Sequence, residues 1–289
     1  MRSSEEIKRL IIDVARKDDR IRTVLLNGSR ANSKILPDKY QDFDIVYVVD
    51  DVESFISDKT WTNLFGDKLI WQLPDEMVVG QKVPEKGPRS LLMLFEDGNR
   101  IDLTLLSKKE INMNYETDSL TMVWLDKDNL FPDIGLPNDS DYLVREPTEK
   151  EFLDTCNEFW WVCTYVAKGL VRNEIIYSKE MLETVVRPMF MNVIAWNIGI
   201  ETNFSVSVGK GGKFMKKFLA PDLYKKILKT YSDHTLENNW KSLFLMMHEF
   251  GQLARTVAVS LKFNYVMTEE KNVTAYVEQL YSEQGSEMK

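Results

Sequence analysis

Cysteine and histidine are scarce in this sequence of 289 residues, with two of each. Cys156 and Cys163 would lie about 10 Å apart along a helix axis, whereas a disulfide brings its Cα atoms within about 7 Å. Both cysteines are therefore expected to be buried in a helix core as free thiols. With the distant His234 and His248, they do not make an ordinary zinc site.

The sequence also lacks long hydrophobic runs and an excess of positive charge. Charged or amide side chains interrupt every apolar stretch before the roughly 18 residues of a membrane span. The first residues, MRSSEEIKRL, lack the apolar core of a signal peptide, so we expect a soluble cytoplasmic protein. The formal net charge is −8, which disfavours nucleic acid as a partner and favours a cationic ligand.

The first half of the chain has the pattern of an α+β domain. Ser3 and Glu6 form a capping box for a helix over about 4–17, and Gly98-Asn99 is a plausible hairpin turn. Short β-rich runs follow the helix, at residues 21–26, 43–49, 68–73, 90–95, 100–106 and 121–125.

The second half has a helical pattern. Residues 126–147 contain three prolines among several Asp and Asn and are typical of a linker. Thr148 and Glu151 then form a second capping box. The pattern stays helical to the end, with breaks near 173–178, 201–213 and 231–237. We therefore predict two domains, residues 1–135 and an all-helical domain over 136–289.

Three polar elements interrupt the predicted strands. Gly28 and Ser29 follow the first strand, where a turn could bind a phosphate or simply connect two elements. Asp42 and Asp44 are two apart, so both side chains face one side of a strand. Two such carboxylates repel each other unless a divalent cation such as Mg²⁺ or solvent lies between them.

The third polar element is Asp102 in the run Arg100–Leu105. Alternation places Ile101, Leu103 and Leu105 on the core face and Asp102 on the other. An aspartate at the centre of an apolar strand requires a partner or a chemical role.

In this order, the three elements resemble the active site of the nucleotidyltransferase superfamily related to DNA polymerase β. The resemblance implies a mixed sheet flanked by helices, with an all-helical bundle domain after it. It also implies two Mg²⁺ ions held by Asp42, Asp44 and Asp102, with the triphosphate of ATP along Gly28 and Ser29.

A narrower resemblance, over most of the chain, is to the streptomycin 6-adenylyltransferases, which modify aminoglycosides. The matching segments are 26–32 (LNGSRAN), 37–38 (PD), 41–45 (QDFDI), 159–161 (FWW), 168–170 (KGL) and 208–214 (VGKGGKF). It implies transfer of AMP from ATP to the streptomycin 6-hydroxyl, release of pyrophosphate, and antibiotic resistance.

Several roles within this scheme have alternatives. Asp102 could serve as the general base, as a metal ligand, or as both. Arg30 could bind a phosphate or form a structural ion pair. Lys213 follows two glycines and precedes an expected lysine-rich helix, and it could reach the triphosphate. Lys168 could do the same. The alternative is that both lysine side chains are solvated.

Other functions also fit parts of the pattern. The same chemistry could act on a lincosamide, a protein side chain or an RNA end, although the net charge disfavours RNA. A non-catalytic nucleotide-binding module typically lacks one carboxylate, whereas all three are present. We expect ATP and a cationic aminoglycoside as partners, and a monomer or weak oligomer.

Overall fold

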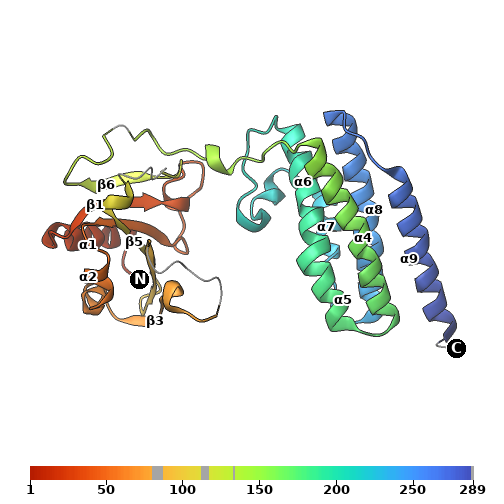
Figure 1. The fold of residues 1–289 in the computed structure, drawn as a ribbon, viewed down its shortest axis with the longest axis horizontal. Helices are drawn as coiled ribbons and strands as arrows, with labels where there is room; N and C mark the ends of the chain where they lie inside the picture. The colour runs from red at the N-terminus through yellow and green to blue at the C-terminus, as the bar shows by residue number, and fades with distance from the viewer. Residues whose placement is uncertain (80–86, 112–116, 133, 288–289) are drawn as a thin grey trace. The chain divides into compact units, whose positions relative to one another are not determined.

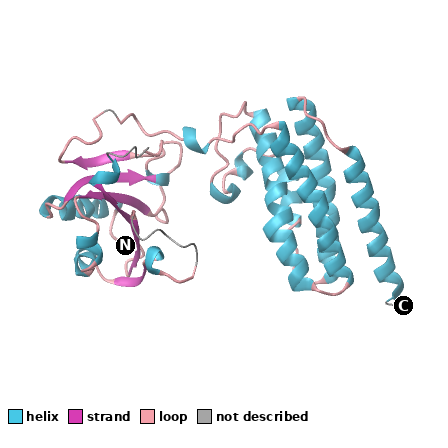
Figure 2. Ribbon diagram, viewed as in Figure 1, coloured by secondary structure: helices cyan, strands magenta, loops and turns pink. Residues whose placement is uncertain are grey.

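A computed structural model describes residues 1–79, 87–111, 117–132 and 134–287. The chain divides into two compact units, Met1–Asp141 and Tyr142–Lys289. The strands belong to the first unit and the long helices to the second (Figures 1 and 2). The fold is thus α+β followed by an all-helical part, as the sequence predicts.

The described strands of the first unit form one mixed sheet in the order β3-β4-β5-β2-β1-β6. The central strands β2 and β5 are parallel, and the other neighbours are antiparallel. The strands are β1 (Ile21–Asn27), β2 (Phe43–Val49), β3 (Lys68–Gln72), β4 (Arg89–Phe95), β5 (Arg100–Ser107) and β6 (Met122–Asp126). The helices of this unit are α1 (Ser4–Lys17), α2 (Glu53–Ile56) and α3 (Lys108–Ile111).

The two faces of the sheet differ in character. On one face, Ile7 and Ile11 of α1 belong to the same buried cluster as Phe43 and Ile45 of β2. On the other face a smaller apolar cluster contains Leu25, Val46, Val48 and Leu106. Asp44 and Asp102 precede these apolar positions along β2 and β5, so the second face is acidic where the two strands begin and apolar farther along them.

The second unit is built on long helices packed around one core. Phe159 of α4 and Phe250 of α8 stack at its centre, with ring centroids 3.6 Å apart. The helices are α4 (Glu149–Val171), α5 (Ile175–Met181), α6 (Arg187–Glu201), α7 (Pro221–Lys229), α8 (Leu236–Leu261) and α9 (Met267–Glu287). None of the helices in the described part of the chain is long and apolar enough to cross a membrane.

The capping boxes and the cysteine predictions are confirmed. Ser3 caps α1 with Glu6, and Thr148 caps α4 with Glu151, each by reciprocal hydrogen bonds. Cys156 and Cys163 are free and buried, and burial raises the pKa of both thiols.

The expected helix after Lys213 is wrong. Residues 210–217 form two short 3₁₀ turns, Lys210–Gly212 and Met215–Lys217, and the next α-helix begins at Pro221. Gly211 and Gly212 have φ values of 64° and 77°, which lie outside the right-handed helical region. This segment therefore has no α-helix N-terminus that could bind an anion.

Candidate active site

Asp42, Asp44 and Asp102 lie at the same end of two neighbouring strands. Asp44 and Asp102 are direct partners in the parallel register of β2 and β5, and Asp42 immediately precedes β2. Phe43 and Ile101, which alternate with them, are 2% and 0% exposed. Because side chains alternate along strands, the buried residues fix the aspartates on the opposite face. The structure thus brings the three predicted carboxylates to one surface.

Gly28 adjoins the same surface. It begins a 3₁₀ turn, Gly28–Arg30, directly after β1, and Asn27 before it is the partner of Asp44 in the β1–β2 pair. Gly28 has a φ of 72°, and an added Cβ would lie 2.4 Å from Asp44 Oδ2. Its N–H donates to the Leu120 carbonyl oxygen. Gly28 therefore provides the turn and the space beside Asp44, while its N–H is already bonded.

Arg30 has structural partners in this turn. Its guanidinium donates to the carbonyl oxygens of Asp42 and Gln41 at 3.0 and 2.6 Å and to Ser4 Oγ at 3.1 Å. It also lies over the Phe43 ring, 3.7 Å from the centroid, and burial lowers its pKa. These contacts give Arg30 a structural role through carbonyl oxygens, a hydroxyl and a ring, whereas its structural ion pair and its binding of a phosphate stay predictions.

Sequence reasoning missed Arg100, which contacts two of the three aspartates. Arg100 Nε and Nη2 donate to Asp102 Oδ1 and Oδ2, both at 2.7 Å. Arg100 Nη1 lies 3.7 Å from Asp42 Oδ2. Arg100 and Asp102 are two apart on β5, so strand alternation already indicated that they share a face. The hydrogen bonds to Asp102 raise the pKa of Arg100.

Asp42 is in an environment that opposes its charge. Partial burial raises its pKa, Arg100 lowers it, and the Asp102 carboxylate raises it again. Burial and like-charge repulsion both favour the neutral acid, so the net shift is upward. A divalent cation bound to the Asp42 carboxylate would favour its charged form.

Two buried oxygen atoms near this strand end have no hydrogen-bond partner among the residues that the structure describes. They are Asn27 Oδ1, at the end of β1, and Thr121 Oγ1, immediately before β6. Asn27 is opposite Asp44 in the sheet register, so its side chain projects from the carboxylate face. A buried polar atom without a partner is costly unless a ligand, ion or water satisfies it. The sequence offered no signal for either atom beyond the presence of a polar residue at a strand end.

The donor chemistry of this strand end fits a hard divalent cation. Mg²⁺ prefers oxygen ligands and commonly binds one or two carboxylates together with substrate phosphates. Within residues 1–79, 87–111, 117–132 and 134–287, however, no group of three or more Asp, Glu, His or Cys side chains is arranged to hold an ion. Arg100 instead contacts Asp42 and Asp102. The residue types fit Mg²⁺, and coordination by all three aspartates requires their side chains to rearrange.

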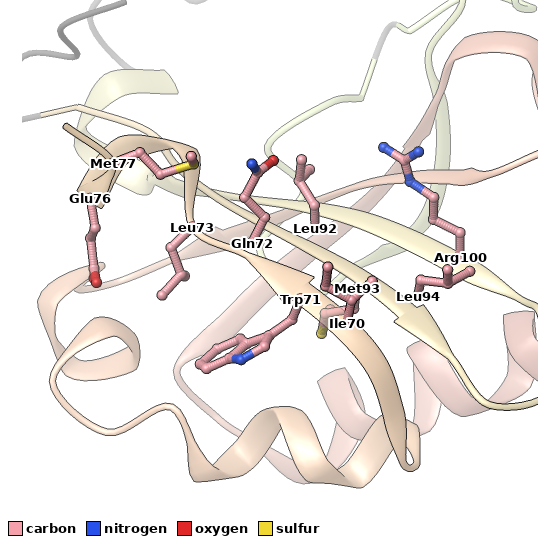
Figure 3. Close-up of a pocket in the computed structure, with 10 residues that line it drawn as sticks. All are labelled: Ile70, Trp71, Gln72, Leu73, Glu76, Met77, Leu92, Met93, Leu94 and Arg100. Atoms are coloured by element: carbon pink, nitrogen blue, oxygen red, sulfur yellow. The ribbon is translucent and has the colours of Figure 1, made fainter. Parts of the chain in front are cut away.

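An open hollow of about 610 Å³ adjoins the carboxylate face. Figure 3 shows its lining on β3, on β4 and on the segment that follows β3, with the Arg100 side chain at one side. Leu92 is the register partner of Asp102, and Leu94 that of Arg100. The wall of the hollow therefore continues the surface that carries Asp102, and it is largely apolar.

The predicted phosphate-binding lysines belong to the helical unit. Lys168 lies on α4, with its Nζ 5.8 Å from the centroid of the Tyr276 ring. Lys213 follows the first 3₁₀ turn, with its Nζ 5.0 Å from the Phe214 centroid. Their assignment to the triphosphate stays a prediction. Of the two adjacent tryptophans, Trp160 is 2% exposed in the core and Trp161 is 59% exposed.

A match to a family model covers nearly the whole chain. The family is described as streptomycin adenylyltransferase, and the match spans residues 1–280. The chain belongs to the streptomycin adenylyltransferase family. The resemblance read from the sequence motifs is thereby confirmed.

Individual proteins are also similar to this chain over nearly its whole length. The chain is 41% identical to an aminoglycoside 6-adenylyltransferase of Bacillus subtilis (strain 168), over 97% of this chain and 99% of the relative. It is 41% identical to one of Campylobacter jejuni, over 96% and 95% of the two chains, and 35% identical to one of Staphylococcus aureus, over 97% and 99%. A crystal structure of the Bacillus subtilis aminoglycoside 6-adenyltransferase matches with a TM-score of 0.48 at 36% identity, over 97% and 99% of the chains.

The contact between Gly28 and Asp44 yields a prediction for this family member. We expect Gly28→Ala to destabilise the first unit by about 1–3 kcal/mol, because a left-handed residue gains a Cβ. The new methyl must also displace the Asp44 carboxylate, so AMP transfer should fall further than the loss of folded protein explains. Thermal unfolding and transfer rate, both measured on soluble protein, test this expectation.

Gly211→Ala is the matched control. Gly211 has a similar φ of 64°, but an added Cβ would meet no atom within 4 Å. The control should therefore show the backbone cost without displacing a carboxylate. If Gly28→Ala loses no more AMP transfer than its loss of folded protein explains, the placement of Asp44 in the site is contradicted.

Proposed function

We propose that this chain transfers AMP from Mg·ATP to the 6-hydroxyl of streptomycin and releases pyrophosphate. Membership of the family and three relatives named aminoglycoside 6-adenylyltransferase support AMP transfer to an aminoglycoside. The structural observation that best supports the proposed location of the active site is the parallel pairing of Asp44 with Asp102 beside Gly28.

The reaction requires that one bond forms and one breaks at the α-phosphorus of ATP. The acceptor hydroxyl oxygen bonds to this phosphorus, the bond to the bridging oxygen breaks, and pyrophosphate leaves. The hydroxyl proton must pass to a base. We assign Asp102 as the candidate base or as a metal ligand that eases loss of this proton.

Asp42, Asp44 and Asp102 are the proposed metal ligands. When bound, two Mg²⁺ ions would neutralise charge on the phosphates and activate the attacking oxygen. Gly28 and Ser29 are proposed to border the triphosphate, where the turn leaves room beside Asp44. Lys168 and Lys213 are proposed as further triphosphate contacts, and Arg30 as a weaker candidate because its donors have structural partners.

The proposed division of labour follows the two parts of the chain. Residues 1–135 would carry nucleotidyl transfer, and residues 136–289 would contribute to nucleotide and acceptor binding. A polycationic acceptor is compatible with the net charge of −8. One helical-unit hollow, of about 490 Å³, is lined in part by Glu151, Asp154 and Trp196, although both acids already pair with basic side chains.

The acceptor is tested with purified chain, ATP and MgCl₂. We expect mass spectrometry to show streptomycin carrying one AMP unit, and no such adduct on a lincosamide or on the protein itself. EDTA should abolish the product, and added excess MgCl₂ should restore it. If an AMP adduct forms only on another acceptor, the chain is still an AMP transferase, but streptomycin is not its substrate.

A further inference from the structure

Arg100 donates hydrogen bonds to both carboxylate oxygen atoms of Asp102. Its Nε and Nη2 bind Asp102 Oδ1 and Oδ2 in the two-pronged geometry that is strongest between guanidinium and carboxylate. The same guanidinium is 3.7 Å from Asp42. One cationic side chain thus contacts two of the carboxylates that we assign to Mg²⁺.

We propose that Arg100 is a positioning residue that competes with the divalent cation for Asp102 and Asp42. The inference rests on the proposed function only in assigning these two aspartates to a metal. A guanidinium and a divalent cation repel each other at close range. They also bind the same two carboxylate oxygen atoms, so a bound ion disfavours the two-pronged contact of Arg100 with Asp102.

The surroundings of Arg100 permit its side chain to leave Asp102. Its side chain is 41% exposed and that of Asp102 is 22% exposed, so the pair is not locked in the core. Arg100 also borders the open hollow on β3 and β4 (Figure 3). A long side chain at the border of open space can change rotamer without moving strand β5.

Two consequences follow for loading of the site. Arg100 lowers the charge repulsion among the aspartates and keeps Asp42 and Asp102 close together. It also weakens binding of a metal ion that arrives alone. A metal ion that arrives with a triphosphate brings anionic oxygens, which are alternative partners for a guanidinium. Arg100 therefore favours joint loading of metal and nucleotide over loading of metal alone.

The test measures Mn²⁺ binding to the full chain without nucleotide, using the electron paramagnetic resonance signal of free Mn²⁺. We expect Arg100→Gln to bind Mn²⁺ more tightly than wild type, by up to about fivefold, the upper end of the scale of one exposed ion pair. Arg100→Lys, which keeps the charge but loses the two-pronged geometry, should lie between them. With a non-hydrolysable ATP analogue present, the difference between wild type and Arg100→Gln should shrink.

Arg20→Gln is the matched control, because Arg20 also binds an aspartate, Asp18, through two nitrogens at the opposite end of β1. It should bind Mn²⁺ as wild type does. In an Asp102→Asn background, removal of Arg100 should no longer tighten binding as much, since the contested carboxylate is gone.

Equal or weaker Mn²⁺ binding by Arg100→Gln, with native circular dichroism, would overturn the proposal and leave Arg100 a purely structural residue. If Arg100→Gln does not fold, the decision passes to Arg100→Lys, whose affinity must exceed that of wild type. Neither outcome depends on the acceptor. Failure of the inference is therefore distinguishable from failure of AMP transfer, which product analysis measures.

Discussion

Replacing Asp44 with asparagine is expected to reduce AMP transfer at least about 100-fold while the fold survives, and Asp42→Asn should do the same. Loss of one carboxylate removes part of the charge that holds the metal ions, a contribution worth several kcal/mol to the transition state. Asp42→Asn also relieves the repulsion between Asp42 and Asp102, and the melting temperature of each variant should shift by no more than about 2 °C. Turnover with streptomycin and calorimetric melting test both parts.

Asp50→Asn is the control for this pair of variants. Asp50 is exposed and follows the last residue of β2, at the end opposite to Asp44. It should keep wild-type turnover. More than about a tenth of wild-type activity in Asp42→Asn or Asp44→Asn would contradict their assignment as metal ligands.

Asp102→Asn is expected to lower turnover by about 100-fold or more, the scale of general-base catalysis. Binding of Mg·ATP should weaken much less, because Asp42 and Asp44 still hold the metal on the triphosphate. Calorimetric titration with Mg·ATP, beside turnover of the same protein, separates the two quantities. Glu96→Gln, an exposed change in the turn before β5, is the control and should alter neither.

The outcomes for Asp102 discriminate between its two roles. If Mg·ATP affinity falls in step with turnover, Asp102 belongs to the nucleotide metal site and another carboxylate must act as the base. If neither quantity changes, Asp102 is structural and the assignment of three functional carboxylates is wrong.

Strong local patterns made most of the fold predictable. The run 43–49 is rich in β-branched and aromatic residues and became β2 with the same bounds. The Gly98-Asn99 turn joins β4 to β5, with Gly98 at a φ of 80°. The carboxylates were predictable because their neighbours in sequence are apolar, and alternation alone then fixes which face they share.

Features that depend on pairing between distant segments were not predictable. The direct pairing of Asp44 with Asp102 requires that β2 and β5 be parallel neighbours, which no local pattern states. The contacts of Arg30 with backbone carbonyls depend on the path of residues 41–42. The helix expected after Lys213 is the opposite case. The local pattern predicted a regular element there, whereas Gly211 and Gly212 have positive φ values and only short 3₁₀ turns form.

Arg100 illustrates why a site is harder to predict than a fold. Its position two residues before Asp102 was visible, but an arginine at a strand start is usually solvated. Only the side-chain geometry reveals that both oxygens of Asp102 are bonded and that Asp42 is close. The unpartnered Asn27 Oδ1 is similar, because burial of one atom is not encoded in residue type.

The most direct test of the central claim is ³¹P NMR of a reaction that contains the wild-type chain, ATP, MgCl₂ and streptomycin. The account predicts equal amounts of pyrophosphate and of a phosphodiester whose phosphorus couples to the proton at carbon 6 of the streptomycin acceptor ring. A phosphomonoester with ADP, or ATP that stays intact beside unmodified streptomycin, would contradict it.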